Sequence, residues 1–309
     1  MDLKTDLCEL PLVQGAAEAK RPTRWWLVAM MIPVVFIIVI GGAVNVAYSA
    51  LIPYESGSLA AQGMEFFTNG AAVLGLWLWL RYKEQRPFSS LGFRGGRMLP
   101  KFGIGLAIGA GMSTLTVAIL LLTGQYQMVP APPNAVGGVA ALLPVILLVI
   151  VWTMQSSTEE ILMRGYLLPT SALQLPGWFA ILIGGLLFSG LHFVEGFLPI
   201  AGVNIILFST LASFVALRQG ALWMVCGIHT AWNWFLGNVF NVPVSGNPYA
   251  TGILHFRPVE NSPQWLSGGS FGPENSIVVT LIWGIAAIAA YRYFRSRREL
   301  SDSMVRSST

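Results

Sequence analysis

Long apolar stretches separated by short polar segments constrain this chain more than any other feature. Because the hydrocarbon core of a bilayer is ~30 Å thick, a helix that spans it needs roughly 20 apolar residues. Apolar stretches of low charge recur along all 309 residues. The sequence therefore predicts an all-α, polytopic membrane protein with about eight transmembrane helices. The expected spans are 25–51, 65–80, 102–124, 139–168, 178–193, 199–217, 221–240 and 277–291.

The overall composition agrees with a membrane protein. Hydrophobic residues make up 54% of the chain and charged residues only 10%, which is typical of a chain that spans lipid. The net charge of +4 comes from Lys and Arg dispersed among short loops. Without a concentrated basic face, we expect no nucleic-acid partner, and membrane lipids are the expected surroundings.

The distribution of cations predicts the topology. The loop 81–101 and the segment after the last span are basic, and the positive-inside rule places both in the cytoplasm. An even number of spans also puts both termini on one side. We therefore expect a multi-pass protein of the cell membrane with both termini cytoplasmic. The cations are Arg81, Lys83, Arg86, Arg94, Arg97 and Lys101 in the loop, and Arg292, Arg295, Arg297 and Arg298 in the tail.

Two adjacent glutamates, Glu159 and Glu160, interrupt the fourth apolar stretch, with Arg164 one turn later. Charged side chains inside a membrane are costly and commonly mark functional sites. Glu160 and Arg164 are four residues apart, so they share a helix face and can pair. Glu159 then points about 100° away around the helix, without a dedicated cation, and can serve as a base. In the alternative, both glutamates only reach the cytoplasmic surface.

Two histidines appear on later apolar stretches in the same i, i+4 pattern. Phe188 precedes His192 by four residues, and His229 precedes Asn233 by four. One intramembrane histidine commonly serves packing, but two histidines with a glutamate pair favour a functional cluster. Helical rise allows these motifs to meet in a cavity that opens to the cytoplasmic side. His255, in the outer loop, is expected to be solvated.

The residue types of this cluster favour hydrolysis by water. No serine lies in a nucleophile-elbow pattern and no cysteine is near, so covalent catalysis has little support. Glu159 would take a proton from water that His192 orients, and His229 with Asn233 would donate hydrogen bonds to the oxyanion. This scheme describes an intramembrane endopeptidase. Its predicted catalytic residues are Glu159, Glu160, Arg164, His192, His229 and Asn233.

A metal site is the alternative arrangement of the same residues. Glu159, His192 and His229 resemble an incomplete zinc site, in which two imidazoles and a carboxylate hold a metal that activates water. The H-E-x-x-H pattern of soluble zinc peptidases is absent. Because the ligands would come from three separate helices, spacing does not decide between a metal-free site and a metalloprotease that binds a divalent metal such as zinc.

The three motifs E-E-x-x-x-R, F-x-x-x-H and H-x-x-x-N, in this order, resemble the signature of the CPBP (CAAX protease and bacteriocin-processing, also Abi) family. The stretch 91–94, Leu-Gly-Phe-Arg, also resembles a piece found upstream in that family. The resemblance implies an all-helical membrane fold related to the Ras-converting CAAX endopeptidase, which removes three C-terminal residues after a prenylated cysteine. It also implies a peptide or C-terminal protein substrate, prenylated in the CAAX case and otherwise a peptide of bacteriocin maturation, self-immunity or secretion.

On this interpretation, five regions are expected. They are a cytoplasmic leader at 1–24, an N-terminal transmembrane region at 25–137, a catalytic core at 138–240 with spans four to seven, an external loop at 241–276, and the last helix with its basic tail at 277–309. Two non-proteolytic functions compete: a membrane scaffold or immunity protein, and a proton-coupled transporter that uses Glu159 as a relay. Against a transporter, the sequence has no repeated halves.

Overall fold

The computed structural model describes the backbone of residues 7–133, 135–193 and 198–307, and the side chains as far as residue 296. The predicted tail cations Arg297 and Arg298 therefore have side chains outside the described part. Helices dominate, in agreement with the predicted all-α class. They are α2 (Pro11–Ala17), α3 (Trp25–Met31), η1 (Ile32–Gly41), α4 (Gly42–Leu51), α5 (Leu59–Leu78), η2 (Trp79–Glu84), η3 (Phe88–Leu91), α6 (Met98–Leu122), η4 (Gly138–Ala141), α7 (Leu142–Glu160), η5 (Ile161–Leu167), α8 (Leu168–Ala172), α9 (Gly177–Gly190), α10 (Pro199–Gln219), α11 (Trp223–Trp234), η6 (Phe235–Val239), α12 (Gln264–Ser267), η7 (Gly269–Phe271), η8 (Pro273–Asn275) and α13 (Ile277–Ser307).

Each of the eight predicted spans overlaps one of these helices. Among the described residues, five helices are long and apolar enough to cross a membrane. They are Trp25–Leu51, Met98–Leu122, Gly138–Ala172, Pro199–Gln219 and Ile277–Ser296. A sixth apolar helix, Gly177–Gly190, is shorter. The chain is thus a multi-pass membrane protein, while the count of eight crossings stays a prediction.

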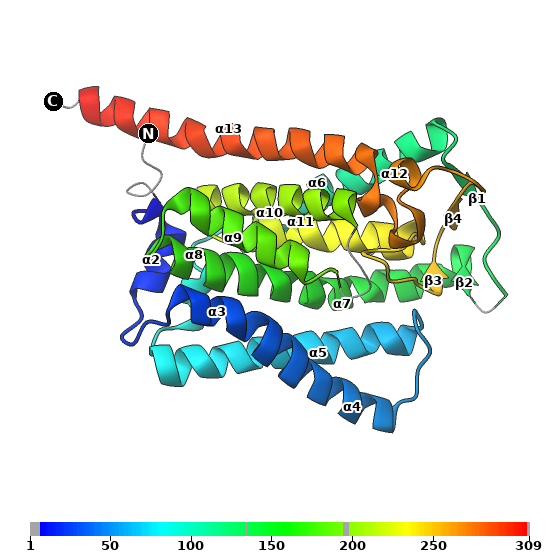
Figure 1. Ribbon diagram of the computed structural model, residues 1–309, viewed down its shortest axis with the longest axis horizontal. Coiled ribbons are helices and arrows are strands. Elements are labelled where there is room, and N and C mark those ends of the chain that lie inside the picture. The colour runs from blue at the N-terminus through cyan, green and yellow to red at the C-terminus, as the bar shows by residue number, and fades with distance from the viewer. Residues whose placement is uncertain (1–6, 134, 194–197, 308–309) are drawn as a thin grey trace.

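The helices pack in layers (Figure 1). Helices α7, α9, α10 and α11 form the middle, α13 runs along one side, and α3, α4 and α5 run along the other. Helix α6 packs closely on α11, because a Cβ at Gly105 would lie 2.1 Å from the Met224 carbonyl oxygen and one at Gly227 would lie 2.2 Å from that of Phe102. Small residues at helix contacts allow this close approach in membranes.

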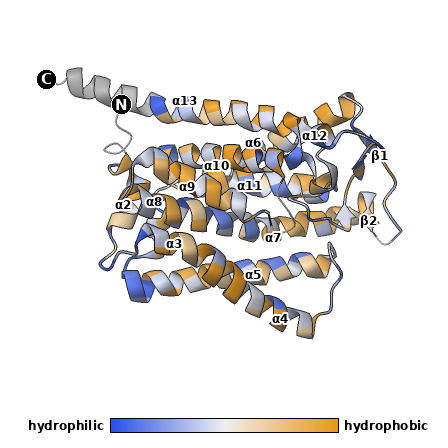
Figure 2. Cartoon of the chain, viewed as in Figure 1, coloured by the Kyte–Doolittle hydropathy of each residue, from blue (hydrophilic) through white to orange (hydrophobic). Residues whose placement is uncertain are grey.

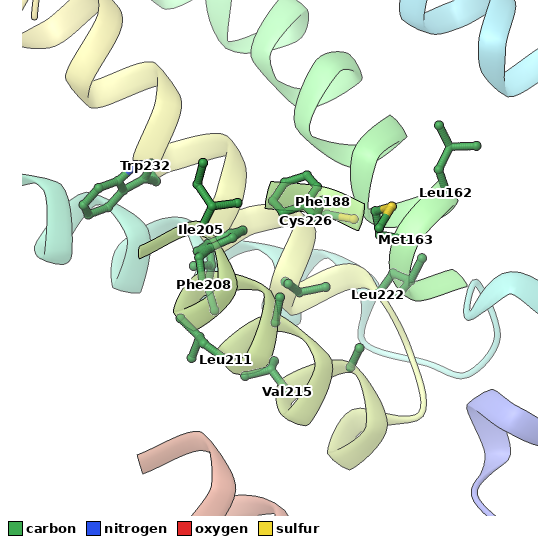
Figure 3. Close-up of a cluster of buried hydrophobic side chains, with 14 of the residues drawn as sticks. Leu162, Met163, Phe188, Ile205, Phe208, Leu211, Val215, Leu222, Cys226 and Trp232 are labelled. Carbon is green, nitrogen blue, oxygen red and sulfur yellow. The ribbon is translucent and has the colours of Figure 1, made fainter. Parts of the chain in front are cut away.

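Hydropathy follows the layers (Figure 2). Hydrophobic residues predominate along the long helices, and hydrophilic residues gather at the end of α5 that η2 extends. Ile38, Leu143 and Ile285 are each about two-thirds exposed (66%, 67% and 68%), as expected where lipid is the solvent. Within the middle layer, a buried apolar cluster joins α9, α10, α11 and η5 (Figure 3). Its labelled members are Leu162, Met163, Phe188, Ile205, Phe208, Leu211, Val215, Leu222, Cys226 and Trp232.

The predicted external loop 241–276 is folded onto the ends of the helices. Its strand β4 (Phe256–Pro258) pairs antiparallel with β1 (Tyr126–Met128), and β3 (Thr251–Gly252) pairs parallel with β2 (Val136–Gly137). We call residues 241–276 the cap segment. Glu274 anchors it, because its buried carboxylate accepts hydrogen bonds from Trp232 Nε1 of α11 at 2.9 Å and from the Ser245 backbone N–H at 2.6 Å.

One sequence prediction about exposure is wrong. His255 was expected to be solvated, but it is 3% exposed and packs so closely on Gly137 that a Cβ there would lie 2.9 Å from His255 Nε2. Arg86 lies in the predicted basic loop, and the structure adds that it is buried, 3% exposed, and pairs with Glu84 at 2.6 Å. Both are covered by segments distant in sequence: strand pairing covers His255, and α2, whose Gly15 carbonyl accepts from Arg86 at 3.2 Å, covers Arg86.

Candidate active site

The Glu160 carboxylate is fully buried, and its charge pairs are made through one oxygen, Oε1, while Oε2 has no hydrogen-bond partner among the described residues. Its Oε1 accepts a hydrogen bond from Arg164 Nη1 at 3.0 Å and lies 2.8 Å from His229 Nδ1. The side chains of Glu160 and Arg164 are 0% and 1% exposed. The predicted i, i+4 pair therefore forms, and neither charge reaches the membrane surface through its own side chain. This is the expected solution for charges in a dry interior, where each must be compensated.

Aromatic rings complete the surroundings of Arg164. Its guanidinium lies over the ring of Phe188, with 4.7 Å to the ring centroid, and 5.8 Å from that of Phe208. Such cation–π contacts stabilise a guanidinium that water does not reach. The ring of Phe188, one turn before His192, thus contacts both the Arg164 guanidinium and the His192 imidazole.

Glu159 has a different environment from its neighbour. Its side chain is 28% exposed, its Oε1 accepts a hydrogen bond from Gln155 Nε2 at 2.6 Å, and its Oε2 lies 3.6 Å from His229 Nε2. The salt bridges of the described residues include none between Glu159 and Lys or Arg. The expectation that Glu159 points away from the Glu160–Arg164 pair agrees with this geometry.

His229 lies between the two carboxylates. Nδ1 faces Glu160 and Nε2 faces Glu159, while the ring of Phe208 packs on the imidazole with centroids 4.8 Å apart. When Nδ1 donates its proton to Glu160, Nε2 accepts in the neutral ring and donates in the protonated ring. Glu160 therefore sets the tautomer and the orientation of the imidazole.

His192 lies just after the end of α9, next to residues outside the described part of the chain. Its Nδ1 lies 2.7 Å from the Phe188 carbonyl oxygen, and the two rings pack edge to face with centroids 4.8 Å apart. Because the carbonyl can only accept, Nδ1 carries the proton and Nε2 is left as an acceptor. A neutral imidazole held in this tautomer can orient a water molecule.

Gln155 is a site residue that the motif analysis missed. Its side-chain oxygen accepts hydrogen bonds from Asn233 Nδ2 at 3.1 Å and from Ser156 Oγ at 3.0 Å, while its NH₂ group donates to Glu159. Asn233 Nδ2 also lies 3.3 Å from Ser156 Oγ. Gln155 thus connects two predicted catalytic side chains. Its position one turn before Glu159 on the same helix was the available signal.

One cavity of about 920 Å³ brings together most of the candidate site residues. Gln155, Glu159, His192, His229 and Asn233 line it, whereas Glu160 and Arg164 lie outside its lining. The predicted convergence of the three motifs on a cavity is confirmed.

The direction in which the cavity extends differs from the expectation. Its lining runs from α7 and α11 to residues 54–57 and to 244–249 of the cap segment. It includes no residue of the basic loop 81–101. The expected opening toward the basic loops is therefore not matched, because the cap segment and the start of α5 extend the cavity toward the opposite end.

A metal site is the alternative arrangement predicted for Glu159, His192 and His229. No three His, Cys, Asp or Glu side chains among the described residues are grouped so that they could hold a metal ion. His192 Nδ1 is directed to a backbone carbonyl, and His229 Nδ1 to Glu160. The set Glu159, His192 and His229 does not form a ready three-ligand site in this arrangement, and metal dependence stays a prediction.

The part of the chain that carries the site matches a known protein family. The model of the family described as type II CAAX prenyl endopeptidase Rce1-like matches residues 141–235. This range includes α7, α9, α10 and α11, and it contains all six predicted catalytic residues. A comparison with curated proteins found no match. Over residues 141–235 the chain is therefore similar to the type II CAAX prenyl endopeptidase Rce1-like family, which supports the resemblance to the CPBP family of CAAX proteases.

Proposed function

We propose that this protein is an intramembrane endopeptidase that hydrolyses a peptide bond near the membrane with water activated by Glu159 and His192. The observation that carries the proposal is the difference between the environments of two adjacent carboxylates. Glu160 is buried and pairs with Arg164, whereas Glu159 faces the cavity, and its Oε2 lies 3.6 Å from His229 Nε2. A carboxylate that is positioned but not neutralised by Arg or Lys can accept a proton from water.

In the proposed mechanism, His192 Nε2 and Glu159 hold the attacking water. Glu159 takes one proton of this water, and the remaining hydroxide attacks the carbonyl carbon of the scissile peptide bond. The C–N bond then breaks, and Glu159 returns the proton to the leaving nitrogen. General acid–base assistance of this kind contributes about 10²- to 10⁴-fold to the rate.

The oxyanion is stabilised by His229 and Asn233 in this proposal. Nδ1 of His229 is held on the Glu160 carboxylate, which directs Nε2 to the oxyanion, and Nε2 donates when the ring carries both protons. Asn233 Nδ2 donates to Gln155 Oε1 and to Ser156 Oγ, and in the proposal the N–H on Ser156 turns to the oxyanion when substrate binds. Removing one oxyanion donor costs about 10²- to 10³-fold in rate in other hydrolases.

The substrate in this proposal is a peptide or the C-terminal end of a protein at the membrane, prenylated in the CAAX case. Lipid surrounds the exposed apolar faces, and both termini lie in the cytoplasm. The division into a leader at 1–24, an N-terminal region at 25–137, a catalytic core at 138–240, the cap segment and a last helix at 277–309 belongs to the same proposal.

The test compares the wild type with Glu159→Gln, both purified in detergent and matched by thermal unfolding. Both are assayed on a fluorogenic farnesylated C-terminal peptide and on unmodified apolar peptides, with and without a chelator. We expect wild-type cleavage that falls at least about 10²-fold in the variant. Undiminished cleavage by Glu159→Gln would refute the role of Glu159, and inhibition by the chelator would show that a metal takes part.

A further inference from the structure

Helix α5, which lies outside the family match, supplies a second polar wall to the cavity. Gln62, Glu65 and Asn69 follow one another at intervals of three and four residues, so they share one helix face. All three line the same cavity as Glu159. Polar side chains on a membrane helix are expensive unless they meet a partner. The three residues differ in whether they have one.

Glu65 and Asn69 partner each other. Asn69 Nδ2 donates to the Glu65 backbone carbonyl oxygen at 2.8 Å and to its carboxylate at 3.2 Å. Gln62 has no such partner. It is 4% exposed, and neither its Nε2 nor its Oε1 has a hydrogen-bond partner among the described residues. Buried side-chain amides are almost always hydrogen-bonded, so a free amide at a cavity wall points to a missing ligand.

The location of Gln62 suggests what the ligand is. Gln62 lies in the first turn of α5, and the cap segment contacts the residues just before this helix, because the Ala250 N–H donates to the Gly57 carbonyl at 2.9 Å. The cavity continues from there to Glu159 at the end of α7. A chain that occupied this cavity would pass both residues. A primary amide carries one acceptor and two donors, which complement the N–H and C=O of a peptide group.

We propose that Gln62 binds a backbone peptide group of the substrate by paired hydrogen bonds and so aligns the chain toward Glu159. The proposal rests on the endopeptidase function given above. It makes Gln62 a substrate-binding residue that reads the peptide backbone, whatever the side chains of the substrate are. It also extends the site beyond residues 141–235 to the N-terminal helices.

The first test separates binding from folding. Gln62→Met keeps the length of the side chain and removes both unpaired polar atoms. We expect KM to rise about 3- to 10-fold, the range of one or two neutral hydrogen bonds, with kcat changed less than twofold and Tm unchanged or higher. A structural role for Gln62 predicts the opposite pattern, a lower Tm with an unchanged KM.

Gln174→Met is the matched control. The Gln174 amide donates to the Thr23 and Thr170 carbonyl oxygens at 3.1 and 3.2 Å and lies outside the cavity lining. We expect this variant to lower Tm and to leave KM unchanged. If Gln62→Met behaves like Gln174→Met, the proposal is wrong.

The second test measures binding without turnover and so does not depend on catalysis. Glu159→Gln and Glu159→Gln/Gln62→Met are titrated with a farnesylated C-terminal peptide and with analogues in which one backbone amide is replaced by an ester. We expect one ester position to weaken binding about 3- to 10-fold in the first protein and to have no effect in the second. Equal ester effects in both proteins, or no peptide binding to either, would overturn the proposal. If the ester effect depends on Gln62 as expected but the wild type cleaves no peptide, the endopeptidase function would be contradicted and the binding role of Gln62 would stand.

Discussion

The described residues include two buried glutamate–arginine pairs, and one of them lies directly behind residues that line the cavity. Glu84 and Arg86, between α5 and η3, lie 2.6 Å apart with 2% and 0% of their side chains exposed. Glu160 and Arg164 lie 3.0 Å apart with 0% and 1% exposed. By burial and charge the two pairs are alike. A buried ion pair is therefore not, by itself, a sign of an active site.

The surroundings of the two pairs differ. The Glu84 carboxylate accepts from the hydroxyl of Tyr166 at 3.0 Å and from that of Thr23, and Arg86 donates to Ser90 Oγ at 3.0 Å. These contacts join the leader to the helices, and none of these five residues lines the cavity. The Glu160 pair instead holds His229 beside Glu159, which does line it. What distinguishes a site is the second carboxylate and an imidazole that solvent or substrate can reach.

The largest expected effect comes from breaking each pair singly. Glu160→Gln and Glu84→Gln each leave a buried arginine without its counter-charge, so both should lower the free energy of unfolding by about 3–5 kcal/mol. Activity per folded molecule should be lost only in Glu160→Gln. Chemical denaturation and cleavage assays on the same samples measure both quantities. Equal specific activity in the two variants would contradict the distinction drawn here.

Replacing both members of a pair sharpens the comparison. In Glu84→Met/Arg86→Met no unpaired charge remains, so part of the lost stability should return, along with full specific activity. In Glu160→Met/Arg164→Met stability should also return in part, but His229 loses its orienting carboxylate and activity should stay at least about 10²-fold down. Recovery of cleavage in the second double variant would show that Glu160 only serves stability.

A smaller effect is expected at Gln155. Gln155→Leu removes the hydrogen bonds that position Glu159 and Asn233, so kcat should fall about 10- to 100-fold with little change in KM. The free energy of unfolding should fall by about 1 kcal/mol per lost hydrogen bond. Gln174→Met, which loses comparable bonds away from the cavity, should show the stability change without the change in kcat. If Gln155→Leu lowers the free energy of unfolding but leaves kcat of the folded enzyme unchanged, Gln155 has no role in positioning the site.

The smallest effect is expected from an exposed pair at the same end of the molecule as Glu84. Arg94 Nη2 donates to Glu18 Oε2 at 2.6 Å, and this hydrogen bond holds the pKa of Glu18 below its usual value. The resulting stability is present above the usual glutamate pKa of about 4.3 and is lost as the pH falls through the lowered pKa of the folded state. Solvent screening limits it to less than about 1 kcal/mol. Tm measured between pH 3 and 6 should depend less on pH in Glu18→Gln; an unchanged profile would contradict the contribution of this pair.

Local spacing explains what could be predicted. The helical ranges follow from runs of apolar residues, and the Glu160–Arg164 pair and the contact of Phe188 with His192 follow from i, i+4 geometry within one helix. The family match on residues 141–235 supports the recognition of three ordered motifs. All of these depend on residues that are close in sequence.

Features that depend on distant segments escaped prediction. The burial of His255 and Arg86 comes from strand pairing and from docking of α2. The extent of the cavity comes from the cap segment and α5, neither of which carries a family motif. The exposure of a residue depends on which helix or strand packs over it. Residue spacing within one segment does not indicate which other segment will pack there.

The sequence by itself determined the membrane class, the helical class, the ordered motifs and the pairing of Glu160 with Arg164, because hydropathy and helical periodicity act locally. Only the tertiary structure decided that Glu159 faces a cavity, that His229 lies between two carboxylates and that Gln155 joins Glu159 to Asn233. It also decided that the Gln62 amide has no hydrogen-bond partner among the described residues. Each of these depends on the relative placement of α5, α7 and α11, which packing sets across long separations in sequence.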